Sequence, residues 1–369
     1  MKPFLAWLML MLAGIARADS LPPIQTVFVI VMENHNWSDI KSNPSAAFIN
    51  NTLLPMASHC EQYYNPTGLH PSLPNYLWLE AGTNFGIYDD NPPVYDHQST
   101  TNHLVSLLDR AGISWRAYQE GVPGTNVPLS NVANYAVRHN PFAYFDDVTG
   151  TNNPSFPYGI AHIRPYTELA ADLTNNTVAR YNFITPDVCS DGHDSCYPLF
   201  DPVGQTDLWL ANELPKILTS TAYSNNGAIF LTWDEGEGGS DGPIGMIVLS
   251  PLARGGGYLN NIYYTHSAAL RTFEEIFHVA PLLGDAASSP DLSDLFASFS
   301  IVDATSLTNG FRLTCIGALP GRTNIVQAST DLATWSAIST NISATHGFTV
   351  IDPAATNMSR RFYRLLQLP

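Results

Sequence analysis

A run of six apolar residues, from Val27 to Met32, places the strongest constraint on how this chain of 369 residues can fold. A strand with no polar position along its length fits the middle of a parallel sheet that helices cover on both faces. The run ends abruptly at Glu33 and Asn34. Because ligands of open α/β sheets bind at the carboxyl ends of the strands, these two polar residues are candidates for a functional site.

A second apolar segment, residues 227–235, ends in the same way, on Asp234 and Glu235. In a parallel sheet both strand ends lie at one edge, so the side chains of Glu33, Asn34 and these two acids would converge there. Carboxylates packed together repel one another unless a cation joins them, and oxygen ligands suit a divalent ion. These four residues are therefore the predicted metal ligands.

Apolar segments and helical patterns alternate along the first 300 residues, which predicts an α/β fold with a parallel sheet. The expected strands are residues 27–32, 114–120, 181–186, 227–235 and 244–251, and the expected helices are 75–82, 102–112, 206–218 and 267–279. From about residue 301 the pattern changes to short alternating segments separated by Gly, Asn, Asp and Pro. This texture is typical of a small all-β sandwich, so residues 301–369 are predicted to form a separate C-terminal module.

The first 18 residues have the pattern of a secretory signal peptide. One Lys precedes an apolar stretch at 4–15, and Ala-Arg-Ala at 16–18 gives a small-x-small cleavage site. The stretch is shorter than the roughly 20 apolar residues that a membrane span needs, and no later segment is long and apolar enough. We expect the mature chain to start at Asp19, to be exported to the periplasm or the extracellular medium, and to lack a transmembrane segment.

Cysteine usage and net charge bear on the partners of the chain. Export permits disulfides, and Cys189 and Cys196, close together in a polar loop, are the expected pair. Cys60 and Cys315 lie in different predicted domains, and we expect both to be buried free thiols.

A formal net charge of −16 argues against nucleic acid or an anionic membrane surface as a general partner. It does not exclude an anionic substrate, because metal ions can reverse the field inside one pocket.

A serine at a predicted helix start is the candidate nucleophile. Ser72 precedes Leu73, Pro74 and a helical pattern, so we expect it at the N-cap. Most serines in such a position only cap the helix. A helix N-terminus also binds phosphate through its free N–H groups and its dipole, and a serine beside a metal ion can ionise and attack phosphorus.

Six motifs, in this order, carry a resemblance to a known family: "VFVIVMENHNW", "HPSLPNYLWLEAG", "RHNPFAYFDDV", "YNFITPDVCSDGHDSC", "LTWDEGEGG" and "YYTHSAALRTFEEIF". They resemble the phosphoesterase family of secreted acid phosphatases and bacterial phospholipases C, in the alkaline phosphatase superfamily. The resemblance covers about residues 24–297 and is greatest to the short acid-phosphatase members, some of which act on phosphoinositides. It implies an alkaline phosphatase-like three-layer α/β sandwich with a mostly parallel central sheet as the catalytic domain, residues 19–300, ahead of the β-sandwich module.

The resemblance also implies roles for particular residues. The family's two metal-binding pairs match Glu33 with Asn34 and Asp234 with Glu235, and its nucleophile matches Ser72. Three histidines are expected to line the phosphate pocket as catalytic groups: His139, His193 and His266. Two further residues are expected to bind substrate: Asn75 and Asp191. The two-zinc members of the superfamily use more histidine ligands than we can place in this chain, so the number of metal ions stays open.

The remaining histidines have a simpler interpretation. A histidine at a strand or loop end more often makes a structural hydrogen bond than takes part in catalysis. The structural class contains His35, His97, His103 and His278, and His70 lies at its border. Asp187, after the expected strand 181–186, is a second-rank candidate for the phosphate pocket.

The predicted function is metal-dependent hydrolysis of phosphate monoesters through a phosphoseryl intermediate. The cofactor would be a divalent metal ion, and the partner a small phosphorylated substrate, with phosphoinositide headgroups among the candidates. Two other classes stay open. One is a phosphodiesterase of the phospholipase C kind with a wider pocket, and the other is a catalytically silent binding protein in which the C-terminal module does the work. The complete set of predicted metal ligands, together with Ser72, favours an enzyme.

Overall fold

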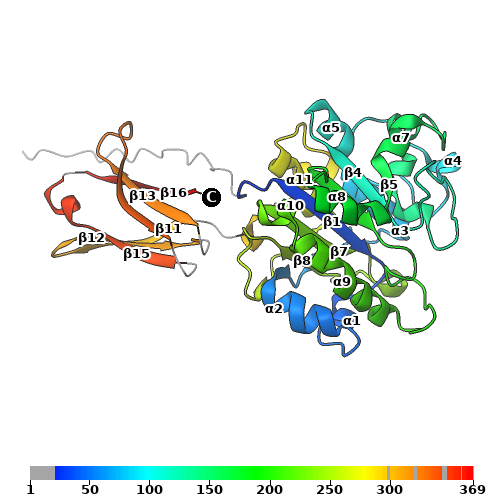
Figure 1. The fold of residues 1–369 in the computed structure, drawn as a ribbon, viewed down its shortest axis with the longest axis horizontal. Helices are drawn as coiled ribbons and strands as arrows, with labels where there is room; N and C mark the ends of the chain where they lie inside the picture. The colour runs from blue at the N-terminus through cyan, green and yellow to red at the C-terminus, as the bar shows by residue number, and fades with distance from the viewer. Residues whose placement is uncertain (1–20, 297–299, 319–321, 343–346, 359, 369) are drawn as a thin grey trace, which may run out of the picture.

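The computed structural model describes residues 21–296, 300–318, 322–342, 347–358 and 360–368. It contains a larger α/β part and a smaller part built mainly of strands, which lie side by side in Figure 1. The predicted signal peptide, residues 1–18, lies outside the described residues.

An eight-stranded sheet forms the centre of the larger part, in the order β5-β4-β6-β1-β7-β8-β2-β9. In that order the strands are Ile163–Pro165, Trp115–Gln119, Tyr181–Thr185, Thr26–Met32, Gly227–Trp233, Met246–Leu249, Ser58–Cys60 and Tyr258–Asn260. Neighbouring strands are parallel except where β8 pairs with β7 and with β2. The mostly parallel sheet is thus confirmed, with β8 as its one antiparallel strand among the described residues.

The apolar run of residues 27–32 lies in the middle of this sheet. β1 lies between β6 and β7, and each residue from Val27 to Met32 is at most 1% exposed. Its pairing with β7 runs without a shift from Thr26 opposite Gly227 to Met32 opposite Trp233. The residues that follow these two strands therefore leave the sheet at the same level and at the same edge.

Helices cover both faces of the sheet (Figure 1). One face carries α3 (Ser72–Ala81), α5 (Leu104–Arg110) and α11 (His266–Phe277), which contact one another, and the other carries α8 (Leu169–Asn175), α9 (Pro202–Leu218) and α10 (Thr221–Ser224). Pro215 lies within α9 without ending it. The shorter helices are α1 (Trp37–Ile40), α2 (Leu54–Met56), α4 (Pro93–Asp96), α6 (Asp146–Thr149) and α7 (Pro157–His162), and β3 (Tyr63–Tyr64) pairs with β10 (Tyr264–Thr265).

The C-terminal part consists of two three-stranded antiparallel sheets. One has the order β11 (Ser300–Leu307), β12 (Gly310–Ile316), β15 (Gly347–Asp352), and the other β14 (Ser336–Ile342), β13 (Thr323–Ser329), β16 (Phe362–Leu368). Leu313 and Val350 of the first sheet and Val326 of the second belong to one buried apolar cluster. The predicted all-β module is therefore confirmed as a fold, and its boundary at residue 301 stays a prediction.

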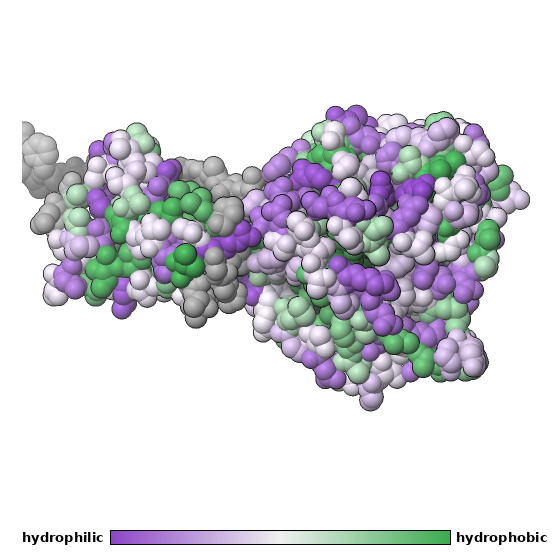
Figure 2. Space-filling view, in the orientation of Figure 1, coloured by the Kyte–Doolittle hydropathy of each residue, from purple (hydrophilic) through white to green (hydrophobic). Residues whose placement is uncertain are grey.

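Polar residues cover most of the face of the larger part seen in Figure 2, with apolar residues in small groups among them. Within the described part of the chain, every helix is too short or too polar to cross a bilayer.

Candidate active site

The two polar strand ends meet at the carboxyl edge of the sheet. The backbone N–H of Asp234 donates to Met32 O at 2.9 Å, and the N–H of Asn34 donates to Asp234 Oδ1 at 3.0 Å. The side chains of Glu33 and Asp234 are both completely buried. The parallel pairing of β1 with β7 thus places two acids in contact range although about 200 residues separate them.

Asn34 adds a third oxygen to this group. Its side-chain oxygen lies 3.3 Å from Glu33 Oε2 and 3.3 Å from Asp234 Oδ1. Three oxygens at such distances repel one another unless the amide turns its nitrogen toward the acids or a cation lies among them. Burial, followed by the charges of Asp234 and Asp191, raises the pKa of Glu33 well above its ordinary range. The donor set therefore fits a divalent cation, which would favour the ionised carboxylates.

Glu33 also belongs to a second group of ligand atoms. Glu33, His139 and Asp191, all buried, each offer one atom within 4.8 Å of the others. His139 Nδ1 lies 3.1 Å from Asp191 Oδ2, and His139 Nε2 lies 3.3 Å from Glu33 Oε1. Burial lowers the pKa of His139 well below its ordinary value, so the imidazole is neutral, which is the form that binds metal ions.

Several polar atoms of these two groups lack a hydrogen-bond partner, although His139 lies within ion-pair distance of Asp191 and Glu33. His139 Nε2, Asp191 Oδ2 and Asp234 Oδ2 are buried and complete no hydrogen bond within the described residues. Unpartnered buried polar atoms are rare because each one loses its hydration without compensation. A divalent ion coordinated by these atoms would satisfy them, so the residues present fit the predicted cofactor.

Ser72 faces the same carboxylates. Its side chain is buried, and its Oγ donates to Glu33 Oε2 at 3.0 Å. Tyr76, one helical turn along α3, donates its hydroxyl to Glu33 Oε1 at 2.7 Å, and its ring stacks on His139. A helix that starts at the carboxyl edge of the sheet thus presents a serine and a phenol to one glutamate.

The expected N-cap role of Ser72 is wrong by one residue. Pro71 has the extended backbone of the N-cap, and Ser72 is the first helical residue. Proline offers no side-chain acceptor, and the free N–H of Leu73 donates instead to Asp90 Oδ1 at 3.0 Å. Ser72 is therefore released from capping, and its hydroxyl is free to contact Glu33.

Glu235 turns away from Glu33. Its Oε2 accepts from Asn75 Nδ2 at 3.1 Å and lies 2.6 Å from His70 Nδ1. Burial, with the charge of Asp234 as the next cause, raises the pKa of Glu235 to about 9. The structure therefore brings Glu33, Asn34 and Asp234 together and places Glu235 beside them, next to the predicted substrate-binding residue Asn75.

The other two predicted catalytic histidines differ in exposure. His193 is partly exposed, with Nδ1 2.7 Å from Asp194 Oδ1 and Nε2 3.1 Å from a guanidinium nitrogen of Arg138. His266 is completely buried, with Nε2 2.6 Å from Asp234 O and Nδ1 3.2 Å from Tyr63 Oη. Burial lowers the pKa of His266 to about 4. Both ring nitrogens of His266 therefore face protein atoms. This geometry favours a structural role in which His266 holds the backbone of Asp234 in place.

A disulfide closes the loop that carries Asp191 and His193. Cys189 and Cys196 are bonded, with their Cα atoms 5.6 Å apart, as expected from their spacing. Asp191 Oδ1 accepts from the backbone N–H of His193 at 2.8 Å, which fixes the turn between them. Cys60 and Cys315 are free and buried, which is also as expected.

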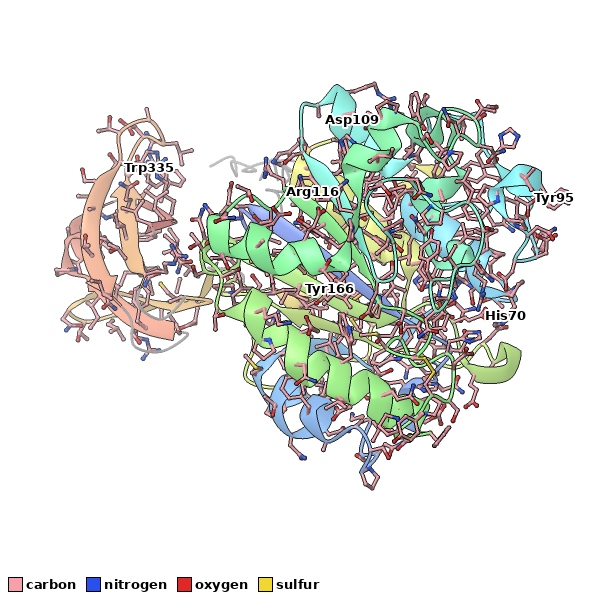
Figure 3. All side chains as sticks on the ribbon, turned by 45° about the vertical axis from the view of Figure 1, so that its right-hand side comes forward. His70, Tyr95, Asp109, Arg116, Tyr166 and Trp335 are labelled. Carbon is pink, nitrogen blue, oxygen red and sulfur yellow. A yellow bond between two sulfur atoms is a disulfide. The ribbon has the colours of Figure 1, made fainter. Side chains whose placement is uncertain are left out.

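Asp187 and His70, the less certain candidates, occupy the rim. Asp187 Oδ1 accepts from the backbone N–H groups of Cys189 and Ser190, so this side chain caps the disulfide loop. His70 links Glu235 to Asp241, at 2.6 and 3.1 Å. Figure 3 shows His70 at the end of the α/β part that is remote from Trp335 of the C-terminal sheets.

Sequence reasoning missed three residues of the site: Tyr76, Asp90 and Arg138. Arg138 directly precedes His139, and that position was the only sign in the sequence. Its guanidinium Nε lies 3.6 Å from Asp90 Oδ2. Asp90 stands in a loop that folds back onto the start of α3, a contact that no local pattern predicts.

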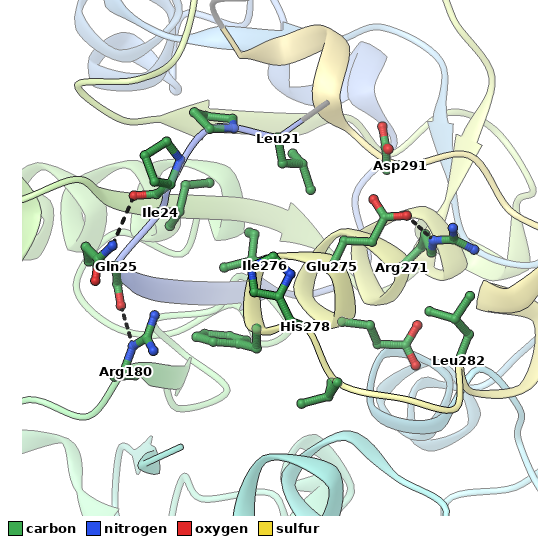
Figure 4. A pocket seen from close by; sticks show the side chains of 15 residues that line it. Leu21, Ile24, Gln25, Arg180, Arg271, Glu275, Ile276, His278, Leu282 and Asp291 are labelled. Carbon is green, nitrogen blue, oxygen red and sulfur yellow. Dashed lines mark hydrogen bonds and ion pairs between the residues drawn. The ribbon is translucent and has the colours of Figure 1, made fainter. Parts of the chain in front are cut away.

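A cavity lies at the opposite, amino edge of the sheet (Figure 4). Its volume is about 590 Å³, and Leu21, Gln25, Arg180, Arg271 and His278 are among the residues that line it. These residues precede β1 and β6 or lie on and after α11, so none of the site residues described above borders this cavity. The candidate active site is therefore the buried cluster at the carboxyl edge.

Comparison with known proteins identifies the family of the chain. The model of the phosphoesterase family matches residues 42–280. A phosphatidylinositol-3-phosphatase of Mycobacterium tuberculosis is 29% identical over 279 residues, which are 76% of this chain and 85% of that protein. A probable acid phosphatase of Kluyveromyces lactis is 26% identical over 292 residues, or 76% of this chain, and the match spans less than two thirds, 63%, of its length.

The fold has a counterpart among solved structures. A protein of the alkaline phosphatase superfamily from Vibrio parahaemolyticus superimposes with a TM-score of 0.51 at 10% identity, over 87% of this chain and 84% of that chain. The expected alkaline phosphatase-like sandwich is thereby confirmed. From the family match over most of the α/β part, the chain belongs to the phosphoesterase family and is a hydrolase that acts on phosphoric esters.

Proposed function

We propose that this protein hydrolyses phosphate monoesters through a phosphoseryl intermediate on Ser72. The observation that carries the proposal is the position of Ser72 Oγ, buried at the start of α3 and 3.0 Å from Glu33 Oε2. The carboxylate would accept the proton of the hydroxyl as the serine becomes a nucleophile.

Glu33, Asn34 and Asp234 would hold a divalent ion, and His139 with Asp191 would add ligands beside Glu33. When bound, the ion would supply positive charge that polarises the phosphoryl group and favours the alkoxide of Ser72. Glu235, which is also buried, would help to orient Asn75 by accepting a hydrogen bond from its Nδ2.

The reaction would proceed in two steps, formation of a phosphoserine and its hydrolysis. Ser72 Oγ bonds to phosphorus while the ester P–O bond on the opposite side breaks, and the leaving alcohol takes a proton from a histidine. We assign this proton to His193, since it is partly exposed and its Nδ1 lies 2.7 Å from the carboxylate of Asp194. Water then attacks the phosphoserine, the bond from phosphorus to Ser72 breaks, and the hydroxyl regains its proton. Positioning by His139, Tyr76 and His266 keeps the acceptor carboxylates in place.

Monoesters are the proposed substrate class, because a terminal phosphate exposes three oxygens that one helix start, Arg138 and His193 can surround. The Mycobacterium tuberculosis relative, named as a phosphatidylinositol-3-phosphatase, adds phosphoinositide headgroups to the candidates. The disulfide supports export to an oxidising compartment.

A panel of esters tests the proposal. Aryl phosphate, bis-aryl phosphate, phosphatidylcholine and inositol 3-phosphate are compared by kcat/KM at several pH values, with chelator and with added divalent ions. The account expects the monoesters to be preferred and the chelator to stop turnover. A preference of more than about tenfold for a diester, equal to about 1.4 kcal/mol in the transition state, would favour the phospholipase C-like alternative instead. Absence of hydrolysis under every condition would contradict the proposal altogether.

A further inference from the structure

Asp90 brings a carboxylate to the place where a phosphate is expected. It lies in the loop between α3 and α4, and its Oδ1 accepts from the backbone N–H of Leu73 at 3.0 Å. Its Oδ2 lies 3.6 Å from Arg138 Nε. Leu73 directly follows Ser72, so the carboxylate rests on the helix start at the residue next to the proposed nucleophile.

The groups that hold Asp90 are those that recognise phosphate in proteins. A free N–H at the first turn of a helix and a guanidinium both favour an anion with several oxygen acceptors. The guanidinium of Arg138 also contacts His193 Nε2 at 3.1 Å, and its side chain is only 16% exposed. Asp90 is more exposed than Arg138, with 34% of its side chain exposed, and its backbone lies in a loop.

We propose that Asp90 is an internal competitor for phosphate and sets the affinity of the pocket for phosphorylated ligands. This inference rests on the proposed function, since it takes the helix start beside Ser72 as the phosphate position. A phosphate that binds there must displace the carboxylate from Leu73 N–H and from Arg138, or share these donors with it against the repulsion of like charges. The carboxylate of Asp90 meanwhile gives the N–H of Leu73 a hydrogen-bond acceptor, so this donor is not left without a partner.

The charge of Asp90 makes this competition depend on pH. Arg138 and His193 face the carboxylate as cationic or potentially cationic groups, and Asp89 and Glu235 are the neighbouring acids. Partial burial raises the pKa of Asp90 above its ordinary value. Competition is therefore strongest when the carboxylate is fully ionised, near neutral and alkaline pH, and it weakens as the medium becomes acidic.

The test is the inhibition constant of inorganic phosphate against aryl phosphate hydrolysis, measured from pH 5 to pH 8. Asp90→Asn keeps an oxygen acceptor for Leu73 N–H and removes the charge. Its inhibition constant should be lower than that of the wild type, by about tenfold at pH 8 for one charge removed at this distance, and the ratio should fall as the carboxylate of Asp90 is protonated. Asp90→Ser replaces the carboxylate by a hydroxyl, which can also accept from Leu73 N–H. Its inhibition constant for phosphate should therefore be lower than that of the wild type as well.

Asp89→Asn is the matched control, because it removes a neighbouring charge whose carboxylate accepts from Asn91 N. Its inhibition constant should stay within about twofold of the wild type. An unchanged or higher constant in both Asp90 variants would overturn the inference and leave Asp90 as a cap of α3. Direct phosphate binding, measured by calorimetry on each protein, separates the two proposals. If Asp90→Asn binds phosphate more tightly but neither it nor the wild type hydrolyses any ester, only the proposed function is contradicted. If hydrolysis is normal but Asp90→Asn binds phosphate as the wild type does, only the proposed role of Asp90 as a competitor is contradicted.

Discussion

The variant Asp234→Asn should be more stable than the wild type without metal ions and less stable than the wild type when a divalent ion is added. Asp234 is completely buried between Glu33 and Asn34, and burial raises its pKa from the ordinary 3.8 to about 6. Asn has nearly the same shape and keeps the acceptor for the backbone N–H of Asn34. The substitution therefore removes mainly the charge.

The magnitude follows from the two pKa values of Asp234. They differ by about two pH units, from 3.8 to about 6, and each unit corresponds to about 1.4 kcal/mol. Because the pKa is higher in the folded protein, folding favours the protonated acid, and the wild type loses stability as the pH rises from about 4 to about 6. Relaxation around a buried carboxylate reduces the effect, so we expect Asp234→Asn to be more stable by about 1–3 kcal/mol at pH 8 and equal near pH 4 when metal ions are chelated.

Urea unfolding of both proteins, followed by circular dichroism, measures these differences. With chelator at pH 8 the variant should unfold at the higher urea concentration. With a divalent ion at a thousandfold excess over its dissociation constant, the wild type should gain about 4.1 kcal/mol. The variant should gain much less, because it has lost one ligand, and the order should reverse.

Asp294→Asn provides a control of opposite sign. Asp294 accepts from Tyr258 and Asn260 and pairs with Arg254, and its pKa is below the ordinary value although burial alone would raise it. Its removal should destabilise the protein at pH 8 with or without metal. If Asp234→Asn is less stable than the wild type in chelator at pH 8, burial does not disfavour the charge of Asp234 as described. If metal does not stabilise the wild type, the ligand assignment is wrong.

Three further predictions concern the rest of the chain. A protein ending near residue 300 should keep its kcat on a soluble aryl phosphate, because the described site lies in the α/β part; a folded but inactive product would show that the C-terminal module completes the site. Replacing Cys189 and Cys196 together by Ala should lower the free energy of unfolding by roughly 2–3 kcal/mol and reduce kcat/KM, and unchanged kinetics would show that the bridge does not position His193. Glu274→Gln should stabilise the protein at pH 8 but not at pH 5, because burial raises the pKa of Glu274 to about 7, and an equal effect at both pH values in urea unfolding would contradict this.

The sequence was most informative where a pattern depends on burial. A continuous apolar strand predicts a central, parallel position, and β1 lies there because both of its faces are covered. The same reasoning placed Glu33 near Asp234 before any contact was known. It could not foresee that β8 runs antiparallel, because a buried strand has the same apolar pattern in either direction.

The site was predictable only in part, for geometric reasons. Asp234 and Glu235 follow the end of β7 in a bend whose course the sequence pattern does not fix: Asp234 contacts Asn34, whereas Glu235 contacts His70 and Asn75. Asp90 and Arg138 meet through loops whose course depends on tertiary packing. Asp191 was expected to bind substrate. It lies beside His139 and Glu33, where it could also be a metal ligand.

Trapping the intermediate tests the central claim most directly. The protein is mixed with radiolabelled aryl phosphate, quenched in acid within a few turnovers, digested and mapped, because phosphoserine survives acid. The account predicts up to one labelled phosphoryl group per chain, on the peptide that contains Ser72, and none in Ser72→Ala, which should fold and bind metal but not turn over. Rapid turnover by the wild type without label on that peptide, or full activity of Ser72→Ala, would contradict a phosphoseryl mechanism at this residue.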